Sequence, residues 1–170
     1  MSTHAAALIA AALAVTLAGD YFLTFTGSHY AAGVSLFCIV QTLYMLVLIP
    51  DAREIAVRLL IWAALIILTA VTGLAPVSII NVLALFDITM LGYNAAKACR
   101  ALPGNDAPPL GCFAAGLTAF FGCDVCVGLN ASGIGGGILW YFIWLFYIPS
   151  QIFIIITLYK LIRGGSNGGT

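Results

Sequence analysis

The chain of 170 residues is 63% hydrophobic and 7% charged. Its mean hydropathy of +1.13 lies far outside the range of soluble proteins, in which roughly a quarter of residues are charged. Six acids and six bases could not cover the surface that a soluble domain of this length exposes to water. The composition therefore predicts an integral membrane protein. With zero net charge and no basic patch, the sequence excludes nucleic-acid binding.

Hydrophobic stretches divide the chain into six candidate membrane spans. A helix needs about 20 apolar residues to cross a hydrocarbon core of roughly 30 Å. The predicted spans are residues 5–25, 31–49, 57–74, 76–98, 110–131 and 138–161, and the main breaks fall at residues 50–54, 73–76, 103–109 and 133–137. Because all connections are short, the pattern predicts an all-α fold, a polytopic membrane bundle forming one domain over residues 1–170. Asp20 lies in the first span and no basic region precedes it, so we expect a retained helix rather than a signal peptide.

The basic residues predict how the bundle is oriented. Lys and Arg in short loops remain on the cytoplasmic side of a membrane. All six bases lie at alternate junctions or near the C-terminus, namely Arg53, Arg58, Lys97, Arg100, Lys160 and Arg163. Both termini are therefore expected on the cytoplasmic side, and we expect this membrane to be the plasma membrane of a prokaryote.

Three acids, Asp20, Asp87 and Asp124, lie inside predicted spans. An acid at the centre of a bilayer costs about 2.5 to 3.5 kcal/mol on insertion scales, whereas an interhelical hydrogen bond in a membrane contributes about 0.6 kcal/mol. A structural role alone does not offset that cost, which favours a functional role for Asp20 and Asp124. Asp87 has Asn81 and Asn94 one or two turns away, so a structural role is favoured for it.

The predicted depths of Asp20 and Asp124 in the membrane are similar. Asp20 lies about 15 residues into the first span and Asp124 about 14 into the fifth, or roughly 21 to 23 Å at 1.5 Å per residue. Both of these helices would run outward from the cytoplasm, so the two carboxyls could lie side by side. Two carboxyls close together in a poorly solvated cavity cannot both ionise readily, so one would keep its proton near neutral pH. Such a pair is equipped for acid and base catalysis.

Two glutamines reach the middle of the membrane from the opposite side. Gln41 lies about ten residues into the second span and Gln151 about thirteen into the sixth, by the same count of helix rise. Both could line the cavity of the two acids. A glutamine in a span is more often a packing contact between helices than a ligand contact, and both roles stay open here.

The cysteines and histidines offer weaker chemistry. Cys123 and Cys126 flank Asp124 with the spacing of a redox dithiol, but inside a membrane helix cysteines more often serve as small packing residues. The two histidines, His4 and His29, lie at predicted helix ends, and no histidine has the spacing to complete a tetrahedral metal site with cysteines. We expect no metal and no organic cofactor.

The polar landmarks, in their order along the chain, resemble the YhhN-type lysoplasmalogenase family. Residues 17–23 (LAGDYFL) resemble its Gly-Asp motif, and residues 32–37 and 41–44 resemble the helix that follows. Residues 87–95 (DITMLGYNA) resemble its Met-rich helix. Residues 116–131, with FGCD at 121–124, resemble its Phe-x-x-Ser-Asp helix, and residues 147–151 (YIPSQ) its Tyr-x-x-Ala-Gln element. Members typically have eight helices, so the chain resembles a shortened member without the first hairpin. Gln41 stands where a His is usual, and Cys123 where a Ser is usual.

The resemblance implies a hydrolase that cleaves the vinyl-ether bond of a lysoplasmalogen, with Asp20 and Asp124 as the matched acids. Vinyl-ether hydrolysis passes through an oxocarbenium-like ion, which resembles the transition state of two-carboxylate glycosidases. A protonated carboxyl can supply the proton and an ionised carboxyl can stabilise the cation. The expected substrate-binding residues are Gln41, Tyr44, Asp87, Asn94, Tyr147 and Gln151. The expected partner is a membrane lipid or lysolipid.

Two rival functions remain open. An ion-coupled transporter of small molecules, or a proton pathway, would also place acids inside a bundle. A non-catalytic membrane protein would need the acids only as contacts between helices. Transport and hydrolysis would be separated by measuring solute flux in proteoliposomes.

Overall fold

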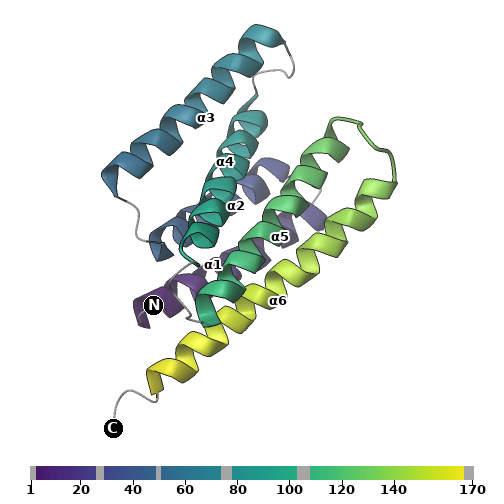
Figure 1. The fold of residues 1–170 in the computed structure, drawn as a ribbon. Helices are drawn as coiled ribbons and strands as arrows, with labels where there is room; N and C mark the ends of the chain where they lie inside the picture. The colour runs from purple at the N-terminus through teal and green to yellow at the C-terminus, as the bar shows by residue number, and fades with distance from the viewer. Residues whose placement is uncertain (1–2, 26–28, 49–50, 74–77, 103–107, 167–170) are drawn as a thin grey trace. The chain divides into compact units, whose positions relative to one another are not determined.

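The computed structural model describes residues 3–25, 29–48, 51–73, 78–102 and 108–166, and within them the chain folds into six α-helices (Figure 1). The helices are α1 (Thr3–Thr24), α2 (Tyr30–Val47), α3 (Ala52–Thr72), α4 (Ile79–Arg100), α5 (Pro108–Ala131) and α6 (Ile138–Ser166). All six are long and apolar enough to cross a membrane. The prediction of an all-α protein with six membrane-spanning helices is therefore confirmed. The expected helix breakers Pro50, Pro76 and residues 103–107 lie outside the described residues.

Local sequence signals explain where several helices begin. Helix α3 begins at Ala52, five residues before the predicted span, because the Asp51 carboxylate accepts a hydrogen bond from the backbone N–H of Glu54 at 2.7 Å and caps the helix. The Ser78 hydroxyl accepts from the N–H of Asn81 at 3.2 Å at the start of α4. Proline at the first position of α5 lacks an N–H that the helix would leave unpaired. Of the charged residues expected to separate the second and third spans, Asp51 caps α3, and Arg53 and Glu54 lie within its first turn.

Helix ends use glycines in the left-handed region. Gly73, with φ of 66°, closes α3. Between α5 and α6, Gly133, Gly135 and Gly136 have φ of 73°, 84° and 59°, a conformation that side chains with a Cβ rarely adopt. The glycine-rich run expected to connect the fifth and sixth spans is thus a turn built on positive φ angles. Helix α6 continues to Ser166, past the predicted end at residue 161, with Arg163 favourably placed in its last turn.

Contacts between Cα atoms group the chain into two compact units, residues 8–93 and residues 1–7 with 94–170. In the first unit, α1 and α2 approach closely at two glycines. A Cβ on Gly19 would lie 2.9 Å from the Phe37 ring, and a Cβ on Gly33 would lie 2.6 Å from Leu23 and 3.3 Å from the Gly19 carbonyl oxygen. The absence of side chains at both positions is what allows this approach. The prediction of a single domain stays a prediction.

Helices α3 and α4 are joined in the same unit by aromatic and cationic contacts. The indole N–H of Trp62 donates to the Val82 carbonyl at 3.1 Å, and its ring meets Phe86 edge to face at 5.4 Å. Arg58, which is completely buried, places its guanidinium 4.9 Å from the centre of the Tyr93 ring. Its charge also interacts favourably with Glu54, one turn earlier on α3. Arg58 therefore ties α3 to α4.

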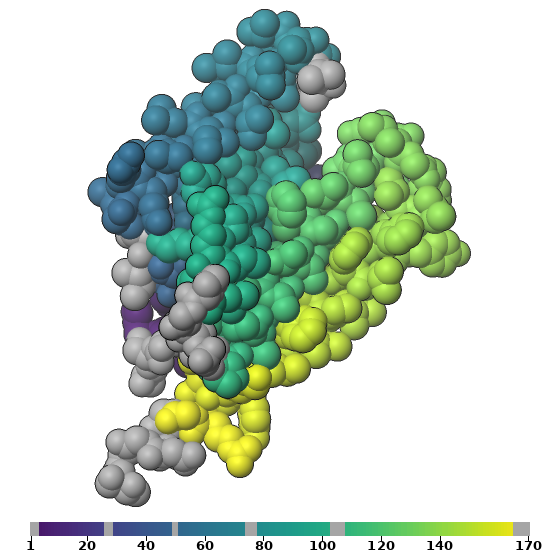
Figure 2. Space-filling model, viewed as in Figure 1, coloured from purple at the N-terminus to yellow at the C-terminus, as the bar shows by residue number. Residues whose placement is uncertain are grey.

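Most other side chains of α3 point outward. Arg58 is the one buried residue of this helix, and Leu60, Ile67, Leu68 and Val71 are exposed. In Figure 2 the side chains of α3, in blue, form part of the viewed surface. A helix with an apolar outer face suits contact with lipid chains.

In the second unit, α5 and α6 form an antiparallel pair (Figure 1). A Cβ on Gly116 would lie 2.8 Å from the Ile154 side chain, 3.2 Å from the Ser150 carbonyl oxygen and 3.3 Å from the Ile154 backbone nitrogen. Further along the pair, the Thr157 hydroxyl donates to the Pro109 carbonyl at 3.4 Å. Small residues at such crossings let the backbones of membrane helices pack closely.

Gly116→Ala is expected to destabilise the protein, because two of the three atoms that its Cβ would meet belong to the backbone and cannot rotate away. Overpacking of this kind typically costs about 1 to 3 kcal/mol. Gly128, on the same helix, has open space around its Cβ position, so Gly128→Ala should stabilise by about 0.5 to 1 kcal/mol through helix propensity. Thermal melts in detergent measure both. Equal melting temperatures for the two variants would contradict the close α5–α6 contact.

Tyr93→Leu is expected to lower the melting temperature, because it removes the ring that faces the buried Arg58. A cation–π contact contributes about 0.5 to 2 kcal/mol when it is shielded from water. Tyr93→Phe keeps the ring and should melt close to wild type. Tyr141→Leu, at an exposed tyrosine of α6, is the matched control and should change little. If Tyr93→Phe melted as low as Tyr93→Leu, the hydroxyl rather than the ring would hold Arg58.

Candidate functional site

The predicted site residues divide equally between the two units. Residues 8–93 contain Asp20, Gln41, Tyr44 and Asp87. Residues 94–170 contain Asn94, Asp124, Tyr147 and Gln151. The two predicted catalytic acids therefore belong to different units, and their common cavity stays a prediction.

Asp124 continues the buried face of α5. Leu110, Phe113, Leu117 and Phe120 are all buried and recur every three or four residues, and Asp124 follows Phe120 by one turn on the same face. Its Oδ2 atom is buried, and the carboxyl as a whole is half-buried. The carboxyl is therefore held among packed side chains rather than on the outer surface of the helix.

Tyr147 and Gln151 lie on α6 in the same unit as Asp124. The Tyr147 ring meets Phe120 edge to face, with ring centres 6.0 Å apart. The Ser150 hydroxyl donates to the Tyr147 carbonyl at 2.7 Å, and the Gln151 amide donates to the Ser150 hydroxyl oxygen at 3.3 Å. The α5–α6 pair thus places an aromatic ring and a chain of polar groups one or two helical turns along from the acid.

Asp20 is half-buried near the C-terminal end of α1. It follows Gly19, whose Cα packs against Phe37 of α2, and it lies one turn after the buried Thr16. Counted from the first residues of their helices, Asp20 lies about 26 Å along α1 and Asp124 about 24 Å along α5 at 1.5 Å per residue. The two acids therefore lie at similar distances from the first residues of their own helices, and their equal depth in a membrane stays a prediction.

Gln41 and Tyr44 are both completely buried on one face of α2. This face also carries Phe37 and Val40, at the spacing of a single helical stripe. The Tyr44 side chain interacts with that of Thr16 on α1. A buried glutamine and tyrosine one turn apart provide polar groups inside the packed part of the unit, where apolar side chains would otherwise be expected.

Asp87 and Asn94 lie two turns apart on α4. Asn94 is completely buried, and the Oδ1 atom of Asp87 is buried. Asp87 lies close enough to Cys38 of α2 for its charge to act on the thiol. Asp87 therefore faces α2 within its unit, as expected for an acid withheld from lipid.

Arg58 is a buried charge whose burial the sequence did not reveal. Its place at the start of the predicted span 57–74 makes it an orientation signal at a junction and gives no indication of burial. The signal that could have found it is the Asp51 cap, because a helix that begins at Ala52 places Arg58 two turns inside. Its contact with Tyr93 depends on tertiary packing.

The five cysteines differ in burial, and the two of the C-x-x-C spacing are the buried ones. Cys123 and Cys126 are both buried on α5, and none of the five cysteines, all within described segments, forms a disulfide. Across the described ranges, no group of three or more His, Cys, Asp or Glu side chains is arranged to hold a metal ion.

Comparisons of the chain with protein-family models, with curated proteins and with solved structures find no match.

Proposed function

We propose that this protein is a membrane-embedded hydrolase of the lysoplasmalogenase type, which cleaves the vinyl-ether bond of a lysolipid with Asp20 and Asp124 as acid and base. The observation that carries the proposal is the position of Asp124, an acid with a buried carboxyl oxygen on the packed face of an apolar helix. An acid in a span costs about 2.5 to 3.5 kcal/mol, which exceeds the contribution of an average interhelical hydrogen bond. The similar depth of Asp20 supports its pairing with Asp124.

The proposed reaction uses one acid and one base without a cofactor. The protonated carboxyl donates its proton to the alkene carbon that is β to the ether oxygen, which leaves an oxocarbenium ion. The ionised carboxylate stabilises this cation and accepts a proton from the water that adds to it. The resulting hemiacetal then breaks its C–O bond. Its hydroxyl proton passes to the first carboxylate, and the departing glycerophospho-alcohol oxygen takes the proton held by the second carboxyl, which returns both acids to their starting states. The products are a fatty aldehyde and the alcohol.

The remaining polar residues are proposed to bind the substrate. In this proposal, polar substrate atoms contact the amides of Gln41, Asn94 and Gln151 and the side chains of Tyr44 and Tyr147, while Asp87 helps to position the lysolipid.

The one-sided distribution of the bases favours cytoplasmic termini. We propose the plasma membrane of a prokaryote as the location.

An ion-coupled transporter is the second candidate, favoured by the buried charge in residues 8–93. Arg58 is completely buried on α3, and hydrolysis by Asp20 and Asp124 gives it no chemical task. Buried ionisable residues in membrane helices commonly mark ion or proton pathways. Flux of a solute driven by a proton gradient in proteoliposomes, abolished by Asp87→Asn, would establish this function instead.

Asp20→Asn and Asp124→Asn are each expected to lower lysolipid hydrolysis by about 10²- to 10⁴-fold, because asparagine keeps the size and polarity of aspartate but cannot cycle a proton. Lipid mass spectrometry after incubation with mixed ether and ester lysolipids measures the products. Both variants should keep the melting temperature of the wild type to within a few degrees.

Cys123→Ala and Cys126→Ala are the matched controls on the same helix as Asp124, and both should leave the rate nearly unchanged. Turnover like that of the wild type in both asparagine variants would contradict the two-acid mechanism. Activity lost only in the cysteine variants would indicate redox chemistry. Wild-type protein inactive on every lysolipid would overturn the proposed activity and favour the transporter.

A further inference from the structure

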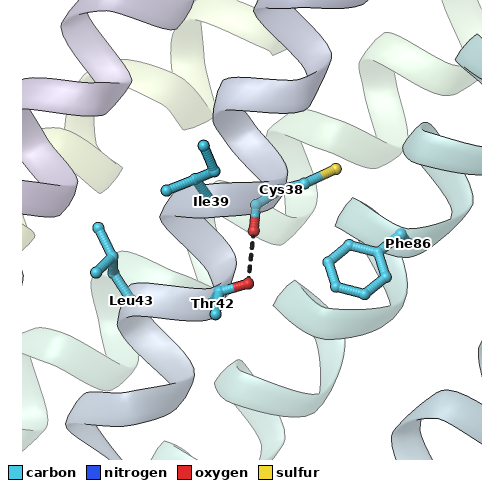
Figure 3. Close-up of a pocket in the computed structure, with 5 residues that line it drawn as sticks. All are labelled: Cys38, Ile39, Thr42, Leu43 and Phe86. Carbon is cyan, nitrogen blue, oxygen red and sulfur yellow. Dashed lines mark hydrogen bonds between the residues drawn. The ribbon is translucent and has the colours of Figure 1, made fainter.

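A groove lies between α2 and α4 within the unit of residues 8–93. Its volume is about 320 Å³, and its lining consists of Cys38, Ile39, Thr42, Leu43 and Phe86. In Figure 3, Phe86 of α4 faces Cys38 and Thr42 of α2 across the groove. Ile39, which is 49% exposed, leaves the groove open at the surface of the unit. A ligand could therefore enter from the side rather than through a buried channel.

The polar atoms of the lining are already engaged with the backbone. The Thr42 hydroxyl donates to the Cys38 carbonyl at 2.9 Å, and the Cys38 thiol donates to the Leu83 carbonyl at 3.4 Å. The other three lining side chains are hydrocarbon. The groove therefore offers no donor that is not already used, and the ligand that suits it presents hydrocarbon alone.

The position of the groove along α2 and α4 indicates which hydrocarbon it would bind. Residues 38–43 lie in the middle of α2, and Phe86 lies about 10 Å along α4. In a helix that spans a membrane, these positions lie within the hydrocarbon core, where lipid chains are the abundant solute. The volume is at the lower end of small-molecule sites. At roughly 30 Å³ for a group the size of a water molecule, it accommodates about ten methylenes, which suits one chain rather than two.

We propose that this groove binds the hydrocarbon chain of a single-chain lipid. The proposal names the element that would select the lysolipid of the proposed reaction, and in that respect it rests on the proposed function.

Trp62 provides a natural reporter of the groove, because its ring contacts Phe86 at 5.4 Å between ring centres. Trp140→Phe and Trp144→Phe leave Trp62 as the sole tryptophan. Bromine atoms on a lipid chain quench indole fluorescence at short range. A lysophospholipid with a brominated chain, titrated into this protein in detergent, should quench Trp62 in a saturable manner. A brominated two-chain phospholipid at equal chain concentration should need at least about tenfold more lipid for half-saturation, which is about 1.4 kcal/mol.

Thr42→Phe fills the groove and should weaken lysolipid quenching at least tenfold. Leu46→Phe, one turn further along α2 at an exposed leucine outside the lining, is the matched control and should bind like wild type. Thr42→Val removes the hydroxyl but keeps the shape of the side chain, and it should also bind like wild type. This second variant tests the proposal even if the Thr42→Phe protein misfolds. If quenching does not saturate, if both lipids quench equally, or if Thr42→Val abolishes quenching, the proposal is wrong.

The titration is made in the Asp20→Asn background, in which the proposed reaction is expected to be about 10²- to 10⁴-fold slower. Saturable quenching there, together with a wild-type protein that hydrolyses no lysolipid, would support the chain site and overturn the hydrolase. Hydrolysis by the wild type without saturable quenching would support the hydrolase and overturn the chain site. The two proposals can therefore fail separately.

Discussion

The absence of water in the hydrocarbon core determines how this chain folds and where its polar groups lie. Every backbone N–H and C=O inside the membrane must find a partner within the protein, and the six helices of the described residues provide most of those partners locally, with Pro149 interrupting the ladder of α6. The same constraint acts on side chains. The hydroxyls of Thr16, Ser35, Thr42 and Thr89 each donate to the carbonyl four residues earlier in their own helix, at 2.6 to 2.9 Å.

This constraint accounts for the division between polar and apolar faces. Gln41, Tyr44 and Asn94 are completely buried, whereas large apolar residues such as Leu17, Leu60 and Ile148 are exposed. In a soluble protein this distribution would be inverted. Against lipid it is the stable arrangement, and it leaves Arg58 and one carboxyl oxygen each of Asp87 and Asp124 buried, where charges interact more strongly than in water.

Composition and hydropathy were sufficient to predict the helices, because each span must be long, apolar and bounded by turn residues. The predicted start of the third span, residue 57, is too late because charged residues are typical of loops as well as of the first turn of a helix. Asp51 and Glu54 instead cap α3 and occupy its first turn. The groove between α2 and α4 could not be predicted, because it depends on which faces of two helices meet. For the same reason the sequence did not reveal the contact of Arg58 with Tyr93.

Two glycines of the sequence motifs have a role in helix packing. Gly19, next to Asp20, is required by the close approach of Phe37, so its presence argues for helix packing and not for catalysis. Gly116 has the same explanation in the α5–α6 pair. The proposed function depends instead on the chemistry of two carboxyls, Asp20 and Asp124, each carried inside an apolar helix. Their similar distance along two helices is the geometric support for treating them as a pair.

The central claim, that these two acids act as one catalytic unit, is tested most directly by the double variant Asp20→Asn/Asp124→Asn. Residues that act together in one step give strongly non-additive losses. If both acids serve the same reacting centre, the double variant should hydrolyse lysolipid about as slowly as the slower single variant. A loss equal to the product of the two single losses, measured under the same conditions, would show that the acids act independently and would contradict the account.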